Sequence, residues 1–376
     1  MGNNGPLFGV PKFGESFPFM KKVLSALFLL ILVAGGGVVY WGYRDLHAPV
    51  SHEKTGHYIN IPRGSAPSVV VGKLAAEGII QHEWPLMIYM KVSGAGSRLK
   101  AGEYNFASPI TPLAVLRRLE QGEQRLVRLT IPEGWTRWDI ASALAKMPEL
   151  KLRDDDEALG LMDDVSTIRD LDPEAKNLEG YLYPDTYEFP PNTTPRAVID
   201  MMVKRFFLVW SESAKNAPPL TLSPRRIVTM ASLIETEAKL ESDRPLIASV
   251  IYNRLKKEIP LGIDSSIIYA SKLAGKWKND GKVYRSDVER VSPYNTRIFK
   301  GLPPGPIASA GAGSLQAALN PAQTNYLYYV RDPSRNDGAH DFYDNDRDFG
   351  KGVQALRNWE RQRDIENAAR RSQQSR

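Results

Sequence analysis

The chain has 376 residues, 42% of them hydrophobic and 24% charged, which predicts two folded domains and excludes a disordered or low-complexity protein. It contains no cysteine, so disulfides, zinc–thiolate sites, iron–sulfur clusters and cysteine nucleophiles are excluded. The net charge of +6 is a mild basic excess, and no recognition motif accompanies it, so we do not expect nucleic acid as a partner.

An uncharged run occupies residues 23–43. At 1.5 Å per residue it is long enough to cross a hydrocarbon core about 30 Å thick. Lysines outnumber acids before it, so the positive-inside rule predicts a cytoplasmic N-terminus over 1–22 and an extracytoplasmic body. Tyr40, Trp41 and Tyr43 stand where an interfacial aromatic belt belongs. A cleaved signal peptide and a buried core helix are the alternatives, but the run is long for a signal sequence and lacks its cleavage site.

A short motif occurs twice after a polar connector at 44–58. Ile-Pro-Arg-Gly at 61–64 recurs as Ile-Pro-Glu-Gly at 131–134, and a helical pattern follows each copy. Each copy therefore predicts a strand, a glycine turn and a helix, although two unrelated turn–helix units would look the same. A strand and a short helix closed by Gly122 lie between the copies. We expect a small α/β module over 59–153.

The remaining sequence predicts a larger domain over 154–360. Its pattern indicates helices at 195–213, 224–240 and 245–257. A long loop region at 258–313, a short helix at 314–319 and an aromatic strand at 324–330 follow. The segment 361–376 is rich in Arg, Gln and Ser and predicts a disordered tail. The fold class expected for the whole chain is α+β, preceded by a single transmembrane helix.

The sequence carries no HExxH, Walker or GxSxG motif and only five histidines, so neither a metal nor a cofactor is expected. What remains is carboxylate chemistry beside aromatic, proline and glycine residues, as in enzymes that act on sugars. Glu235 and Glu237 of the helix at 224–240 point about 160° apart, so they cannot form a paired dyad. Glu237 lies at the edge of the apolar face, where burial raises the pKa of a carboxyl and suits it to general acid catalysis. Glu235 is expected to pair with a buried donor, and two solvated glutamates are the simpler alternative.

Further motifs accompany these acids. They include EGYLYPDTY with its alternating tyrosines, LGIDSSIIY, SPYNT and the run GLPPGPI at 301–307. The tyrosines offer stacking surfaces for sugar rings, although half-buried strand residues have the same pattern. The Gly/Pro run predicts a stiff wall with backbone groups free to meet a ligand, and an inert connection is an equal alternative. The late histidine, His340, is expected to be structural.

Together with the N-terminal anchor, the motifs MASLIETEA, LGIDSSIIY, SPYNTRIFKGLPPGPIASAG and EGYLYPDTY resemble the endolytic murein transglycosylases of the YceG-like family. The resemblance implies a single-pass enzyme of the bacterial inner membrane, with a LysM-like module over 59–153 and a periplasmic catalytic domain. It implies cleavage of the β-1,4 bond between N-acetylmuramic acid and N-acetylglucosamine in nascent strands, leaving a 1,6-anhydromuramoyl end and terminating elongation. The implied partners are peptidoglycan glycan strands and peptidoglycan synthases at the membrane.

The family motif has the form ASIIEKE, and its second, catalytic glutamate falls on Glu237. Together with the polar motifs, the resemblance assigns eight residues to substrate binding: Glu235, Asn253, Arg254, Asp264, Tyr294, Asn295, Tyr183 and Asp185. The family's loop LQTDPTVIY has Gln, Thr and Pro at the positions of Gly262, Ile263 and Ser265. We expect the lost Gln to remove a substrate contact, and none of the three changes to touch the acid.

A single acid suffices for this reaction, because the muramoyl 6-hydroxyl attacks within its own sugar and no water needs activation. Two other functions stay open at this point. One is a non-catalytic peptidoglycan-binding scaffold that recruits partners, and the other is a hydrolytic muramidase that releases reducing ends.

Overall fold

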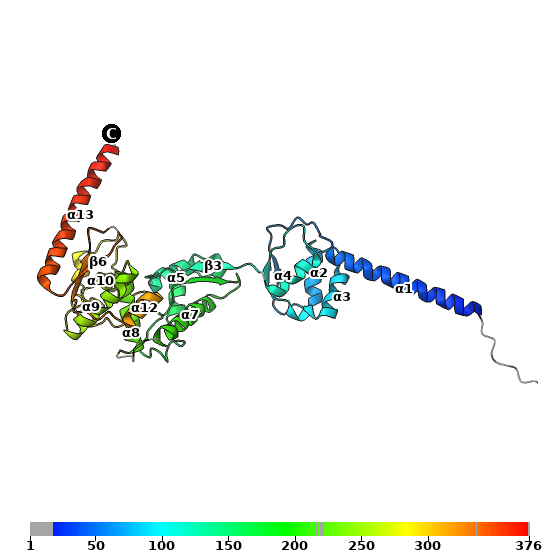
Figure 1. Ribbon diagram of the computed structural model, residues 1–376, viewed down its shortest axis with the longest axis horizontal. Helices are drawn as coiled ribbons and strands as arrows, with labels where there is room; N and C mark the ends of the chain where they lie inside the picture. The colour runs from blue at the N-terminus through cyan, green and yellow to red at the C-terminus, as the bar shows by residue number, and fades with distance from the viewer. Residues whose placement is uncertain (1–17, 123, 216, 219–221, 336, 375–376) are drawn as a thin grey trace, which may run out of the picture. The chain divides into compact units, whose positions relative to one another are not determined.

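The computed structural model describes residues 18–122, 124–215, 217–218, 222–335 and 337–374 (Figure 1). The chain forms two compact units, Met1–Arg125 and Leu126–Arg376, each made of helices and short antiparallel strand pairs. This mixed, helix-rich architecture confirms the predicted α+β class. The units divide before residue 153, where we placed the end of the module, because the second copy of the repeated motif pairs with a strand of the second unit.

The first unit begins with helix α1, Pro18–His47. Its segment Lys22–His47 is long and apolar enough to cross a membrane, by length and composition. Residues 1–17, most of the predicted cytoplasmic segment, lie outside the described residues. The helix runs past the predicted membrane span into the connector, and Leu46 is buried in the core of the first unit.

Strands β1, Ile59–Ile61, and β2, Gly102–Tyr104, form an antiparallel pair in the first unit. Between and after them lie the helices α2, Pro67–Ala76, α3, Glu83–Ser93, and α4, Pro112–Gln121. Helix α4 starts where the Thr111 hydroxyl accepts a hydrogen bond from the Ala114 amide, and it ends at Gly122, as predicted. These elements enclose one apolar core.

The repeated motif forms a strand, a turn and a helix in both places. In the first copy β1 leads through Gly64 to α2, and in the second β3, Val127–Thr130, leads through Gly134 to α5, Arg137–Ala145. Gly64 and Gly134 have φ values of 76° and 78°, a left-handed conformation that side chains with a Cβ rarely adopt. Both places therefore have the local structure that the motif predicts. Its copies fall in different units, since β3 pairs with β4, Thr186–Phe189.

Helix α8, Pro224–Glu237, is the central element of the second unit. Its residues 227–234 are all buried, and it packs against α9, α10 and α12, which span Arg244–Lys256, Asp264–Leu273 and Ala312–Leu319. Helix α7, Pro195–Lys215, and the hairpin of β5, Tyr328–Arg331, with β6, His340–Tyr343, complete the body. Two shorter helices are α6, Asp155–Met162, and α11, Arg285–Val288.

Two expectations differ from the structure. The region 258–313, predicted as loops, contains α10 and the short α11. The ten residues of α10 stand between glycine- and proline-rich segments that obscure their pattern. The tail predicted to be disordered is helical up to Gln374 within α13, Asp346–Gln374. Its Arg, Gln, Glu and Ala residues are good helix formers, a property that composition alone does not separate from disorder.

Candidate functional site

Glu237 is the last residue of α8, where the chain turns to an extended conformation at Ala238. Two hydroxyl groups contact its carboxyl group. Tyr329 Oη donates to Oε2 at 3.0 Å, and Ser265 Oγ lies 3.4 Å from Oε1. The carboxyl therefore lies where the end of the central helix meets the start of α10 and strand β5.

Burial raises the pKa of Glu237 above its usual value, and the negative charge of Asp264 acts in the same direction. The hydrogen bonds from Tyr329 and Ser265 and the charge of a protonated His340 lower this pKa, but less than burial raises it. The group thus keeps its proton to a higher pH than an ordinary glutamate. Its hydroxyl partners stabilise the carboxylate that forms when the proton is given away.

Tyr329 is a contact that the sequence did not predict. Its ring meets the His340 ring edge to face, with the centroids 5.4 Å apart. His340 Nδ1 and the His340 amide both lie 3.0 Å from Asp243 Oδ2. Asp243 is buried, so this pair fixes the β5–β6 hairpin against the start of α9. The expectation of a structural role for His340 agrees with these contacts.

Ser265 corrects one prediction. We expected none of the three departures in the loop LGIDSSIIY to touch the acid, and this was wrong, because Ser265 Oγ donates toward Glu237 Oε1. Ser265 also accepts a hydrogen bond of 2.7 Å from Thr236. A proline at this position has no hydroxyl, so this chain has one more polar group at the carboxyl than the family motif.

Glu235 has a buried side chain that is 5% exposed. Its Oε2 accepts the Gly311 amide at 2.9 Å, and its Oε1 lies 3.3 Å from Arg244 Nη2. Both oxygens are engaged within the protein, in agreement with the expectation that Glu235 pairs with a buried donor. The geometry favours positioning of the chain before α12 over direct contact with a ligand.

Asn253 and Arg254 hold the segment that leads into β5. Asn253 Nδ2 donates to the carbonyl groups of Thr324 and Tyr326, both at 2.9 Å. Arg254 donates to the carbonyl group of Leu327 at 2.6 Å and to that of Leu261 at 2.7 Å. These bonds place Tyr329 on Glu237, so both side chains act through the strand.

Asp264 is the first residue of α10 and faces solvent, paired with Arg297 at 2.6 Å. Its side chain is 58% exposed, which leaves it accessible to a ligand. Asp185 is also solvent-facing and receives a hydrogen bond of 2.8 Å from Arg205 Nε. The negative charge of Asp264 also raises the pKa of Glu237, which links this predicted residue to the acid.

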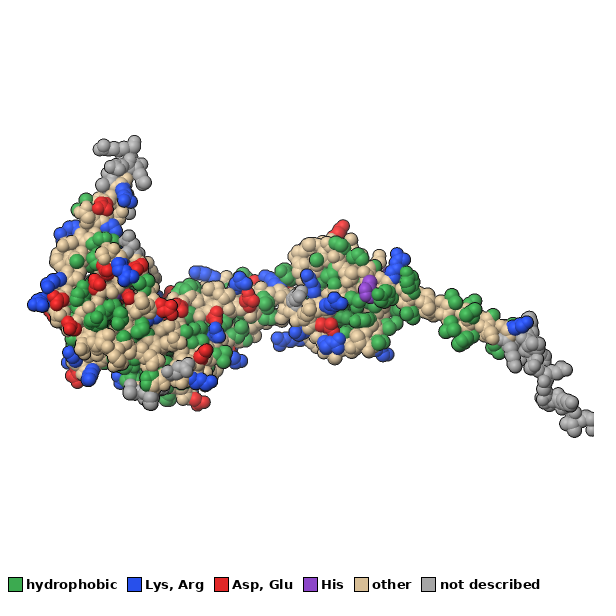
Figure 2. Space-filling model, in the orientation of Figure 1, with side chains coloured by type: hydrophobic (Ala, Val, Ile, Leu, Met, Phe, Trp, Pro, Cys, Tyr) green, Lys and Arg blue, Asp and Glu red, His purple; other side chains and the backbone are tan. Residues whose placement is uncertain are grey.

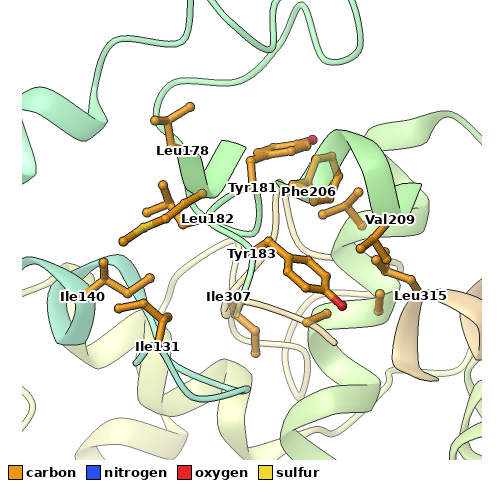
Figure 3. Close-up of a cluster of buried hydrophobic side chains, with 14 of the residues drawn as sticks. Ile131, Ile140, Leu178, Tyr181, Leu182, Tyr183, Phe206, Val209, Ile307 and Leu315 are labelled. Atoms are coloured by element: carbon orange, nitrogen blue, oxygen red, sulfur yellow. The ribbon is translucent and has the colours of Figure 1, made fainter. Parts of the chain in front are cut away.

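Tyr183 and Asn295 lie in the interior. Tyr183 is 8% exposed, and Figure 3 shows its ring among Phe206, Val209 and Leu315, inside the hydrophobic cluster rather than at a stacking surface. Asn295 is fully buried and donates to the carbonyl groups of Val288 and Arg290. The alternating tyrosines form core residues here, which was the alternative reading of that pattern.

Tyr294 lines a cavity of about 390 Å³. Its ring centroid lies 4.9 Å from that of Tyr269, and Pro304, Gly305 and Pro306 also line the cavity. Glu179 is buried at this cavity, and its carboxyl group accepts the Arg137 amide and the Tyr269 hydroxyl, all at 3.2 Å. Burial raises the pKa of Glu179 to about 7. The sequence placed Glu179 in a motif but gave no sign of its burial.

The chain from Gly301 to Gly311 runs along α8 and is bonded to it at three places. Arg225 Nε donates to the Pro304 carbonyl at 2.8 Å, and Ser232 Oγ accepts the Ile307 amide at 3.0 Å. The third bond joins the Gly311 amide to Glu235. On its other side the segment exchanges two backbone bonds with the turn at Gly134 and Trp135, through Ser309. The prediction left these backbone groups free to meet a ligand, but three of them bond to α8 within the protein.

The chain is similar to known proteins over most of its length. The model of the YceG-like family matches residues 59–355. The endolytic murein transglycosylase of Bacillus subtilis (strain 168) is 37% identical over 320 residues, covering 80% of this chain and 85% of the relative. That of Streptococcus pneumoniae serotype 2 (strain D39) is 29% identical over 358 residues, and the chain spans 64% of its length. The crystal structure of a yceG-like protein from Listeria monocytogenes superposes with a TM-score of 0.53 at 32% identity, covering 78% of this chain and 98% of that one.

Proposed function

This chain belongs to the YceG-like family and is an endolytic murein transglycosylase, and from this premise we propose that Glu237 is the one acid and base of its reaction. The supporting observation is the environment of the carboxyl. Burial raises its pKa, while Tyr329 and Ser265 donate to it, so both the protonated and the ionised form are accommodated.

In the first half of the reaction, protonated Glu237 gives its proton to the glycosidic oxygen as the bond from this oxygen to C1 of N-acetylmuramic acid breaks. The sugar develops oxocarbenium character, and the leaving strand departs with a free hydroxyl group. In the second half, the 6-hydroxyl of the same muramoyl residue bonds to C1 and passes its proton to the Glu237 carboxylate. The acid is restored, no water is consumed and the product carries a 1,6-anhydro end.

Substrate contacts fall into two groups in this proposal. Asp264, Tyr294 and Asp185 have exposed or cavity-lining side chains and would meet the strand directly. Glu235, Asn253, Arg254, Asn295 and Tyr183 bond or pack within the protein and would act by positioning other groups. The cavity beside Tyr294 supplies aromatic and proline surfaces of the kind on which sugar rings pack.

We also propose that the enzyme works on nascent strands beside peptidoglycan synthases, anchored in the inner membrane by α1 with its body in the periplasm. The support is the apolar segment Lys22–His47 and the lysine excess before it. A LysM-like, glycan-binding role is proposed for the first unit. Its strands β1 and β2 pair with each other, and α2 and α3 lie between them in the sequence. This compact unit is shorter than the predicted module.

The experiment incubates the full chain in detergent with glycan strands and analyses the muropeptides by mass spectrometry. Anhydro ends, lighter than hydrolysed ends by one water, are expected. Glu237→Gln should lower the rate at least about 100-fold, the usual contribution of a general acid, with little change in thermal melting. Glu212→Gln, an exposed carboxyl on α7, is the control and should keep full activity. Ends with water added would instead indicate a muramidase, and unchanged strands a scaffold.

A further inference from the structure

Helix α3 of the first unit carries an apolar stripe that is largely exposed among the described residues. Trp84, Ile88 and Val92 recur every fourth residue, so they lie on one side of the helix. They are 39%, 55% and 84% exposed, whereas Leu86 and Met90 on the other side are buried in the core. Among the described residues of this unit, hydrophobic side chains gather near the point where α1 joins it (Figure 2).

The stripe starts at the end of the apolar helix. The Trp41 ring of α1 stacks on the Trp84 ring, with centroids 5.2 Å apart and planes 16° apart. A Cβ atom at Gly42 would lie 3.2 Å from the Trp84 ring, so the glycine permits this close approach. One turn further, Asp45 pairs with His82 at 2.8 Å. The helix therefore enters the first unit through direct packing.

Trp41 belongs to the aromatic group at the outer end of the apolar run, where indole rings settle at the level of the lipid headgroups. Trp84 is stacked on it and is held at the same depth. From this geometry we propose that the stripe Trp84–Ile88–Val92 seats the first unit on the lipid surface of the membrane that α1 crosses. The proposal rests on the proposed membrane anchorage by α1.

Two further features favour lipid as the occupant. Lys91 is exposed beside Val92, where its long side chain can reach anionic headgroups while its stem lies on the apolar surface. A mostly apolar hollow of about 400 Å³ opens next to Ile88, lined by Pro67, Met87, Met90 and Gly96 as well. Such a surface matches the interfacial layer, which offers acyl chains and phosphate groups together.

The test uses the absence of cysteine, which allows a single fluorescent label at any chosen position. The variants Val92→Cys, Val33→Cys and Thr55→Cys of the full chain are labelled with an environment-sensitive dye and placed in vesicles of phosphatidylcholine and phosphatidylglycerol. Val33 reports the anchor, and Thr55 is an exposed position of the same unit, in the connector before β1 and not on α3. All three substitutions replace exposed side chains, so folding should be retained.

The label at Val92 should be quenched by lipids that carry a nitroxide near the headgroup, and quenching by aqueous iodide should be several-fold weaker than at Thr55. Iodide quenching equal to that at Thr55 would overturn the proposal. Protection from iodide without quenching by the lipid nitroxide would also overturn it, because a protein would then cover the stripe. If the lipid nitroxide quenches the label at Val33 but not that at Val92, membrane anchorage by α1 is supported and lipid contact of the stripe is overturned. If Val33 itself is exposed to iodide, the anchorage fails first.

Discussion

The two oxygens of Glu237 have unequal partners, and this difference bears on where its proton resides. Tyr329 donates to Oε2 at 3.0 Å, a well-formed hydrogen bond. Ser265 is 3.4 Å from Oε1 and is a weaker partner. An oxygen that already accepts a strong bond is the poorer site for a proton. In the proposed mechanism, Oε1 is then the oxygen that carries the proton to the glycosidic oxygen.

Tyr329→Phe tests this arrangement. The variant removes a hydrogen bond to the ionised form, so the pKa of Glu237 should rise further. Since the first half of the reaction needs the protonated acid, activity is lost as the pH rises through this pKa. The alkaline limb of the pH–rate profile should move to higher pH, and the maximal rate should fall about tenfold, because the carboxylate is a less stable product of proton transfer. Tyr328→Phe on the same strand is the control, and an unchanged profile in both variants would contradict the role of Tyr329.

Glu179 gives a prediction about stability. The unfolded chain releases this proton near pH 4.5, whereas the folded protein holds it until about pH 7. The folded state therefore binds more protons between these values, and its stability falls as the pH rises through the window. The loss amounts to about 3 kcal/mol once the pH exceeds 7. Glu179→Gln removes the ionisation. The free energy of unfolding should therefore fall less between pH 5 and pH 8 in this variant than in the wild type.

Denaturant unfolding at the two pH values measures this difference. Glu174→Gln, at an exposed carboxyl nearby, serves as the control and should show the same pH dependence as the wild type. A Glu179→Gln variant whose stability difference does not change between pH 5 and pH 8 would mean that the buried carboxyl titrates normally.

At the residue scale, the sequence was sufficient for what depends on helical spacing and insufficient for what depends on distant segments. Glu237 and Glu235 were distinguished by their position relative to an apolar face, and the bond from Glu235 to Gly311 agrees with the role expected for it. Tyr329 reaches Glu237 across 92 residues of chain. No local pattern encodes that distance, and the same holds for the contact of Ser265.

At the scale of elements, hydrogen bonds from α9 hold the segment that leads into β5, the strand of Tyr329. Asn253→Ala removes two hydrogen bonds to the carbonyl groups of Thr324 and Tyr326, which should lower the stability by about 1–3 kcal/mol. The strand that holds Tyr329 should loosen, so kcat should fall more than KM changes. Thermal melting and steady-state kinetics measure both. Lys256→Ala, an exposed position on the same helix, should change neither.

Elements with a clear apolar period were predictable. Helices α7, α8 and α9 fall within a few residues of their predicted ranges, and Gly122 ends α4 as expected. Helix α10 was missed because its polar first turn follows a glycine-containing loop, and α13 was missed because its composition resembles that of a disordered segment. For α13 the signal of a helix is propensity rather than periodicity, whereas α10 is rich in Ser, Ile and Tyr and has neither signal in strength.

At the scale of the whole molecule, the proposed membrane anchorage rests on the apolar run of α1. Leu30 lies near the middle of the predicted span, and Leu30→Arg places a charge there at a penalty of about 2.5–3.5 kcal/mol for insertion. The variant should move from the vesicle fraction toward the soluble fraction in flotation. Its activity on isolated strands in detergent should be unchanged, and Leu30→Phe should float like the wild type. Equal flotation of the arginine variant would argue against a membrane span.

The bonds of segment 301–311 bear on how it opens under heat or protease. Its Gly- and Pro-rich sequence suggests an easily opened loop, but the amides of Ile307 and Gly311 bond to side chains of α8, and Ser309 bonds to the turn at Trp135. Opening this segment therefore requires α8 or that turn to move as well. It belongs to the same cooperative unit as the central helix, and its amides should exchange with solvent only when that unit opens.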